Sequence, residues 1–238
     1  MIGYNRKAIR VGKLEGCGSS LPAGKVGGDF FEFFVHNNKN VVAAIGDVMG
    51  KGFPAACLMK TIHTMLCECV NITPHPLEVV RRLNKIGGDE LRRRGAFVTL
   101  CIIYCDGETG RLSCVNAGHH PPIIVSNGEV KVVRCRGVAL GLLEDYLGTG
   151  EEEIYLSPGD MVVMYTDGLV EAFGPGEKRY GLERLKKIVH QQPDADAAKM
   201  KRCILSDLKN FTRGYSQRDD ITLLVLRVLK KAGEGCGD

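Results

Sequence analysis

The sequence predicts an α+β fold: two packed, mostly antiparallel β-sheets flanked by helix pairs, an α-β-β-α sandwich. The predicted elements occur in the order strands, a helix pair, many strands, a second helix pair and a final strand. Most links between strands are too short for a helical crossover, which favours antiparallel pairing. Helix pairs that cover packed sheets bury their apolar faces in a layered sandwich.

The first strands and helices follow from the periodicity of apolar residues. Residues 29–35 and 41–47 are strand-like, and residues 54–70 form a predicted helix with Pro54 in its first turn. A second helix is predicted over residues 77–94, with Gly87 and Gly88 as its weak point. The turn around Pro74-His75-Pro76 would join the two helices into a hairpin.

The middle of the chain predicts a series of hairpins. Residues 97–105 and 111–116 are strands joined by the turn Asp-Gly-Glu-Thr-Gly. Residues 123–126 and 130–134 flank Asn127-Gly128, a strong hairpin turn. Residues 161–166 are uniformly apolar, as in a strand that is buried on both faces.

The remaining elements are a second helix pair and a last strand. Helices are predicted over residues 182–190 and 194–211, with Asp194 as N-cap of the second helix. Residues 221–228 form the final strand. Residues 1–229 are therefore predicted to be a single domain, and residues 230–238 a disordered tail with an exposed Cys236.

Composition limits the function classes. The 238 residues are 44% hydrophobic, and no apolar run approaches the roughly 20 residues of a membrane span. With no recognisable export signal, we expect a cytoplasmic protein that does not associate with membranes. The ten cysteines are scattered without Cys-x-x-Cys pairs, which favours reduced, mostly buried thiols over a zinc site. A net charge of +4 without a dense basic stripe does not indicate nucleic-acid binding.

Five aspartates stand where strands end or begin. They are Asp29, Asp47, Asp167, Asp219 and Asp220. Each alone is equally well explained as a residue that caps a turn. Together they would form an oxygen-only pocket, which suits Mg²⁺ or Mn²⁺ rather than zinc.

Such a pocket has a known chemistry. Two metal ions about 4 Å apart share a carboxylate and activate a bridging water for in-line attack on phosphorus. Glycines beside the aspartates would let the backbone approach the ions closely.

Six runs carry the aspartates and their surroundings, over about residues 21–228: VGGDFFEFF, IGDVMGKGFPAA, FVTL, NAGHHPPII, PGDMVVMYTDGLVEAF and RDDITLLVL. In their order and spacing they resemble the 2C-type metal-dependent protein phosphatases (PPM family), most closely the bacterial SpoIIE-like branch. The resemblance implies a serine/threonine phosphatase with two Mn²⁺ or Mg²⁺ ions.

The resemblance also implies roles for individual residues. Asp47 would bridge both ions, with the Val48 carbonyl on the second ion. Asp167 would bind the first ion, which makes Asp47 and Asp167 the predicted catalytic residues. Asp29 would lie beside the second ion, directly or through water.

The adjacent pair Asp219-Asp220 leaves a choice of ligand. Asp219 matches the family ligand of the first ion, whereas Asp220 falls where relatives often have asparagine. Asp219 is therefore the predicted ligand and Asp220 a possible one.

Two features of many eukaryotic relatives are missing. Met49 stands at the position of their proposed acid histidine, and their phosphate-gripping arginine has no clear counterpart. Lys25 is nearby but is better explained as a solvated turn residue. The substrate-binding residues stay unknown at this level, and both absences resemble the bacterial branch.

Other residues near the motifs are predicted to be structural. His119 and His120 are expected to pack at a strand junction, and Thr99 and Thr166 to support backbone geometry near the ligands. Glu171 either holds a metal-bound water or is an exposed carboxylate at a helix end.

The catalytic pattern begins almost at once, as in the compact RsbX-like stressosome phosphatases. This implies a phosphoserine or phosphothreonine protein as partner, of the STAS-domain stressosome or anti-sigma antagonist type. The helix pair over residues 54–94, directly after Asp47, is hypothesised to affect metal occupancy. The alternatives are a non-catalytic phosphoprotein-binding module of the same fold and, least favoured, a small-molecule phosphohydrolase.

Overall fold

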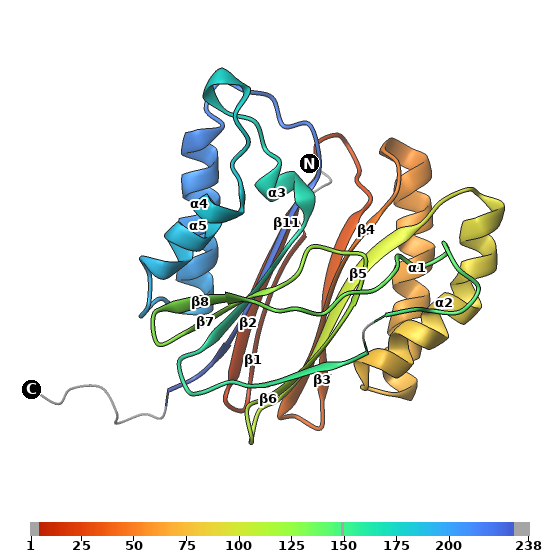
Figure 1. The fold of residues 1–238 in the computed structure, drawn as a ribbon, viewed down its shortest axis with the longest axis horizontal. Helices are drawn as coiled ribbons and strands as arrows, with labels where there is room; N and C mark the ends of the chain where they lie inside the picture. Colours follow the sequence, from red (N-terminus) through yellow and green to blue (C-terminus); the bar gives the residue numbers. More distant parts are fainter. Residues whose placement is uncertain (1–4, 149, 231–238) are drawn as a thin grey trace, which may run out of the picture.

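The computed structural model describes residues 5–148 and 150–230 of the chain. Two β-sheets pack face to face, and a helix pair covers the outer face of each (Figure 1). Sheet A has the strand order β1-β2-β11-β10-β7-β8, and sheet B the order β3-β4-β5-β6-β9. Every pair of neighbouring strands in the described residues is antiparallel, which confirms the predicted fold class.

The strands of sheet A are β1 Asn5–Val11, β2 Leu14–Leu21, β7 Ile123–Ser126, β8 Glu129–Val132, β10 Met161–Tyr165 and β11 Ile221–Val228. Those of sheet B are β3 Asp29–His36, β4 Asn40–Val48, β5 Val98–Asp106, β6 Arg111–Ala117 and β9 Glu152–Tyr155. The helices are α1 Gly52–Ile72, α2 Pro76–Arg93, α3 Asp167–Val170, α4 Leu182–His190 and α5 Ala197–Phe211, with a 3₁₀ turn η1 at Pro175–Glu177.

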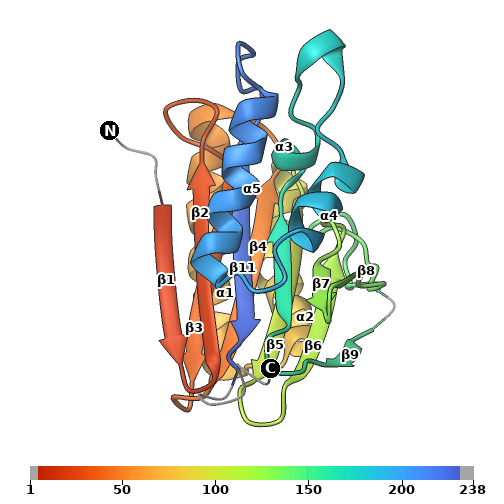
Figure 2. The same ribbon diagram turned by 90° about the vertical axis from the view of Figure 1, so that its left-hand side faces the viewer.

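Three apolar layers hold the sandwich together. One lies between α1–α2 and sheet B, one between the two sheets, and one between sheet A and α4–α5. Figure 2 shows α4 and α5 in front of sheet A. Both helix pairs thus pack an apolar stripe onto a sheet face, as their helical periodicity predicted.

Strands β1, β2 and β9 are not among the predicted elements. Strand β2 has the sequence LEGCGSSL, and because of its glycines it lacks the pattern of large apolar residues by which strands are predicted. The structure gives the reason for them: a Cβ on Gly18 would lie 2.3 Å from a ring carbon of Phe31, and one on Gly16 2.8 Å from Phe33. These glycines make room for aromatic rings of the facing sheet.

Helix α2 runs as predicted through Gly87, where a Cβ would lie 3.2 Å from Ile62, so glycine allows the close approach of α1. One local expectation was wrong. The N-cap of α5 is Asp196 and not Asp194, because the Asp196 carboxylate accepts the Lys199 amide at 2.5 Å. Asp194 instead pairs with Lys230.

Two further expectations concern membranes and the chain end. None of the helices in the described ranges combines the length and the apolar character needed to cross a bilayer. The predicted tail, including Cys236, lies outside the described residues from position 231 onward.

Candidate metal centre

The predicted aspartates lie at strand ends in both sheets. Asp29 opens β3 and pairs in register with Asp47 near the end of β4, and Thr99 of β5 is the next partner of Asp47. In sheet A, Asp167 directly follows β10, and Asp219 and Asp220 directly precede the neighbouring strand β11. The facing sheets thereby bring together carboxylates that are up to about 190 residues apart in the sequence.

The electrostatics show that these carboxylates face one another. Burial raises the pKa of Asp47 to about 7, and the charges of Asp167, Asp219 and Asp220 add to the rise. Burial and Asp47 likewise raise the pKa of Asp29, and burial and Asp219 raise that of Asp167. For Asp29, Asp47 and Asp167, burial and mutual repulsion outweigh the compensating interactions, and a divalent cation would supply the missing positive charge.

Asp29 is the most enclosed of the predicted aspartate ligands, with 7% of its surface exposed. The Thr166 hydroxyl donates to Asp29 Oδ2 at 2.7 Å and itself accepts the Thr222 amide at 2.9 Å. These contacts connect the start of β3 to β10 and β11. The predicted supporting role of Thr166 is therefore present as a hydrogen bond.

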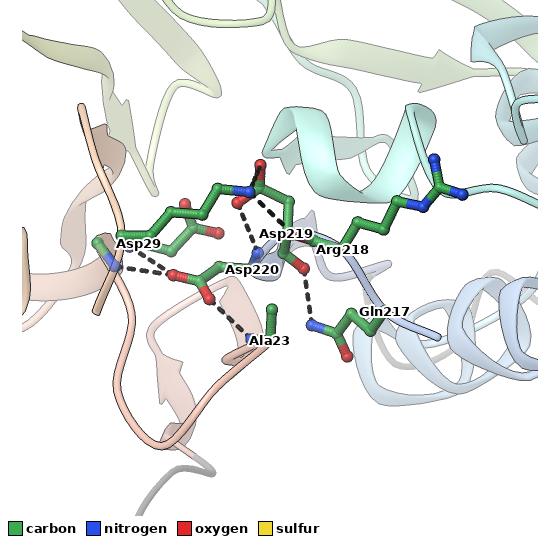
Figure 3. Close-up of polar contacts among 8 residues, drawn as sticks. Ala23, Asp29, Gln217, Arg218, Asp219 and Asp220 are labelled. Atoms are coloured by element: carbon green, nitrogen blue, oxygen red, sulfur yellow. Dashed lines mark hydrogen bonds and ion pairs between the residues drawn. The ribbon is translucent and has the colours of Figure 1, made fainter. Parts of the chain in front are cut away.

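The neighbouring residues Asp219 and Asp220 have different contacts and different exposure (Figure 3). Asp220 is 9% exposed, and its carboxylate accepts the amides of Ala23 at 2.8 Å and Gly28 at 2.7 Å. Asp219 is half exposed, and its Oδ2 lies 3.1 Å from Lys51 Nζ. Asp220 thus holds the loop before β3, and Asp219 offers its carboxylate to the open side of the cluster.

The glycines beside the aspartates allow the backbone to approach other protein atoms closely, whereas the sequence analysis expected them to allow an approach to metal ions. A Cβ on Gly28 would lie 2.7 Å from the Val48 carbonyl oxygen, and one on Gly168 would lie 1.9 Å from the Asp220 carbonyl oxygen. Only glycine fits at these positions. The Val48 carbonyl and Asp47 Oδ1 consequently lie together beside Gly28.

The donor atoms fit a hard divalent cation. Within residues 5–148 and 150–230, no three acidic, histidine or cysteine side chains are already gathered as a ready-made metal site. Asp29 is engaged by Thr166 and Asp219 by Lys51, and the carboxylates repel one another. The available donors are carboxylates and the Val48 carbonyl, the oxygen ligands that Mg²⁺ and Mn²⁺ prefer.

The other residues named from the sequence have structural contacts. His119 is 8% exposed, its Nδ1 lies 2.8 Å from the Thr99 hydroxyl, and burial lowers its pKa to about 3. The His120 ring stacks on Tyr165 at 5.6 Å. The Glu171 carboxylate accepts from Arg179 at 2.7 Å, which matches the alternative of a surface carboxylate.

The structure adds a cavity that was not predicted. It has a volume of about 970 Å³ and is lined on one side by Asp219 and Asp220. Lys25, Lys51 and Arg218 also line it. The available signal in the sequence was the basic residue in Gly50-Lys51-Gly52, directly after the Asp47 loop.

A comparison with protein-family profiles identifies the family of the chain. The sequence profile of Stage II sporulation protein E (SpoIIE) matches residues 37–229, which include every candidate ligand except Asp29. The chain belongs to the SpoIIE family. This confirms the SpoIIE-like resemblance that the six motifs carried.

Individual relatives share less than a third of their residues with this chain. Phosphoserine phosphatase RsbU of Bacillus subtilis (strain 168) is 28% identical over 225 residues, which cover 93% of this chain and 64% of RsbU. The chain spans less than two thirds of the length of the curated relatives it matches.

Solved structures share the fold. The SiaA-PP2C domain of Pseudomonas aeruginosa has a TM-score of 0.79 at 20% identity, with 88% of this chain and 85% of that domain covered. RsbX in complex with magnesium has a TM-score of 0.68 at 17% identity, with 94% and 100% covered. These similarities establish the two-sheet PP2C fold for the chain.

Proposed function

We propose that residues 1–229 form one metal-dependent serine/threonine phosphatase domain that removes phosphate from a regulatory phosphoprotein. The observation that carries the proposal is the meeting of Asp29, Asp47, Asp167 and Asp219 at one end of the two sheets, with raised pKa values for the first three. Membership of the SpoIIE family and similarity to a phosphoserine phosphatase support it.

The proposed ligand set follows the positions of the donors. Asp47 would contribute to holding two Mn²⁺ or Mg²⁺ ions, Asp167 and Asp219 would hold one of them with it, and Asp29 and the Val48 carbonyl would hold the other. The half-exposed carboxylate of Asp219 favours it over buried Asp220, which already accepts backbone amides.

The chemistry requires a nucleophile and charge compensation. Divalent cations supply both, by lowering the pKa of water and by stabilising negative charge on the phosphoryl group. The chain's own residues orient the carboxylates: Thr166 fixes Asp29, and Asp220 fixes the loop that leads to it. Met49, 41% exposed beside Asp47, offers no proton, so protonation of the leaving group falls to water or to another group.

The proposed substrate is a phosphoserine or phosphothreonine protein in the cytoplasm. The motif resemblance to the SpoIIE-like branch motivates a STAS-domain regulator of the stressosome or anti-sigma antagonist type, and similarity to the phosphoserine phosphatase RsbU supports a phosphoserine substrate. An open cavity beside the acidic cluster is consistent with a phosphorylated side chain presented by a folded protein.

The decisive test measures phosphate release from a phosphoserine STAS-domain protein with Mn²⁺, Mg²⁺ or EDTA. We expect metal-dependent release, abolished by EDTA and lowered by more than ~100-fold in Asp47→Asn, since losing even an outer partner of a metal ligand costs 10- to 100-fold. Unchanged thermal unfolding of Asp47→Asn without metal is the control for folding.

A generic aryl phosphate separates the alternatives. Slow metal-dependent hydrolysis of that ester without release from the phosphoprotein would mean that the substrate is wrong. Binding of the phosphoprotein with no hydrolysis of either compound would identify a non-catalytic module and overturn the proposal.

A further inference from the structure

The Lys51 ammonium group lies at the edge of the acidic cluster. Lys51 Nζ donates to the Arg218 carbonyl at 2.9 Å and to Asp219 Oδ2 at 3.1 Å. Its side chain is 68% exposed. An ammonium group has three donors, and among the described residues only two acceptors are recorded for this one. One donor therefore remains for a ligand in the cavity.

The backbone around Lys51 holds it in this position. Gly50 and Gly52 have φ values of +107° and +71°, which let the chain turn sharply between β4 and α1. Lys51 is the N-cap of α1, with no side-chain hydrogen bond to the helix, and the first turn contains no acidic residue. The positive end of a 21-residue helix therefore lies beside the ammonium without an anion from its own first turn.

The other basic residues of the cavity differ from Lys51. The Arg218 guanidinium lies over the Phe173 ring at 4.2 Å and within 4.0 Å of Glu177. Lys25 lines the cavity from the exposed loop before β3. Of the three, Lys51 is the one whose charged group touches a proposed metal ligand.

We propose that Lys51 binds the phosphate group of the substrate, an assignment that rests on the proposed function. A phosphate dianion held next to Asp219 lies within reach of the remaining N–H of Lys51. Lys51 would thus perform the task of the arginine that has no counterpart in this chain. The charge contributed by Asp219 also keeps Lys51 at the site before the substrate arrives.

The position of Lys51 predicts opposite effects on two ligands. A positive charge 3.1 Å from Asp219 opposes the binding of a cation and favours the binding of an anion. Replacing Lys51 by methionine should therefore weaken phosphate binding while metal binding stays equal or becomes tighter. A merely structural role in holding the Arg218–Asp219 turn would weaken both.

The experiment titrates inorganic phosphate into the full chain with Mg²⁺, and titrates Mg²⁺ alone, by calorimetry. The proteins are wild type, Lys51→Met, Lys51→Arg and, as a matched control, Lys85→Met, which removes an exposed lysine of α2 outside the cavity. For Lys51→Met we expect roughly 10- to 100-fold weaker phosphate binding, the value of a hydrogen bond to a charged group. Lys51→Arg should recover much of it, and Lys85→Met should equal wild type.

Aryl phosphate hydrolysis by the same proteins separates this assignment from the proposed function. An active wild type with an unchanged KM and phosphate affinity in Lys51→Met overturns the role of Lys51 only. An inactive wild type whose phosphate binding still depends on Lys51 overturns the phosphatase proposal only. Parallel loss of phosphate and Mg²⁺ affinity, or no phosphate binding by wild type, overturns the role of Lys51.

Discussion

The two helix pairs cover equivalent outer faces of the sandwich, but one contains a helix whose first turn is capped by a side chain and the other a helix whose first turn is not. Helix α5 begins after its N-cap Asp196, whose carboxylate accepts the Lys199 amide. Helix α1 begins after Lys51, which leaves its own helix uncapped and reaches Asp219 at the other sheet. The N-cap residue thus stabilises its own helix in α5, whereas in α1 it contacts the acidic cluster instead.

The largest expected effect comes from Asp220, which both stabilises the fold and holds the loop that leads to the acidic cluster. Replacing Asp220 by alanine removes the acceptor for the Ala23 and Gly28 amides. The Gly28 amide is buried and the Ala23 amide only partly so. A buried unsatisfied donor costs about 1–3 kcal/mol, so we expect a loss of about 3 kcal/mol in the free energy of unfolding. Urea unfolding measures it, and metal-dependent activity should fall as well, since the loop leads to Asp29.

The control for that prediction is the neighbouring residue. Asp219→Ala should lose activity while its urea unfolding midpoint stays close to wild type, since Asp219 is half exposed. Equal destabilisation by both substitutions would contradict the separate tasks assigned to the two aspartates.

A smaller effect is expected on the α5 side. Asp196→Ala removes the N-cap and should lower the free energy of unfolding by about 1 kcal/mol. Activity per folded molecule, measured at saturating metal, should not change. A loss of activity greater than the loss of folded protein would show that the α4–α5 side also shapes the site. Asp194→Ala is a suitable control, because within residues 5–148 and 150–230 that carboxylate pairs with the exposed Lys230.

The remaining effect depends on pH and concerns the contact of α1 with the sheets. Burial alone would raise the pKa of Glu32, but hydrogen bonds from His63, Lys7 and the Phe33 amide outweigh it and lower the pKa to about 2. Because the folded pKa lies below the ordinary 4.5, this contribution to stability is present above pH 4.5 and is lost as the pH falls towards 2.

Urea unfolding at pH 5 and pH 3 tests this contribution. The difference in stability between the two pH values should be smaller for Glu32→Gln than for wild type. An identical pH dependence in the two proteins would show that Glu32 does not help to hold α1.

The sequence predicted elements well where the local signal and the tertiary structure agree. Helix α4 and strand β11 match their predicted bounds, because both carry a clear apolar period between polar boundaries. Strand β2 was missed because its small residues are dictated by the rings of Phe31 and Phe33 in another sheet. A local pattern contains no information about a partner that distant.

The same limit applies to the site. The aspartates could be named from their positions at strand ends and from the family motifs. The different surroundings of Asp219 and Asp220 could not, since they depend on loop amides about 190 residues away. The contact of Lys51 with Asp219 spans 168 positions and requires both sheets to be in place.

Strand β11 lies between β2 and β10 in the interior of sheet A, although it is the last described strand in the chain. During synthesis, β2 and β10 emerge from the ribosome long before the strand that connects them. Asp219 and Asp220 emerge just ahead of that strand. A nascent chain therefore carries an incomplete acidic cluster until residue 228 has left the exit tunnel, and its sheet A has an unfilled strand position that other strands can occupy until then.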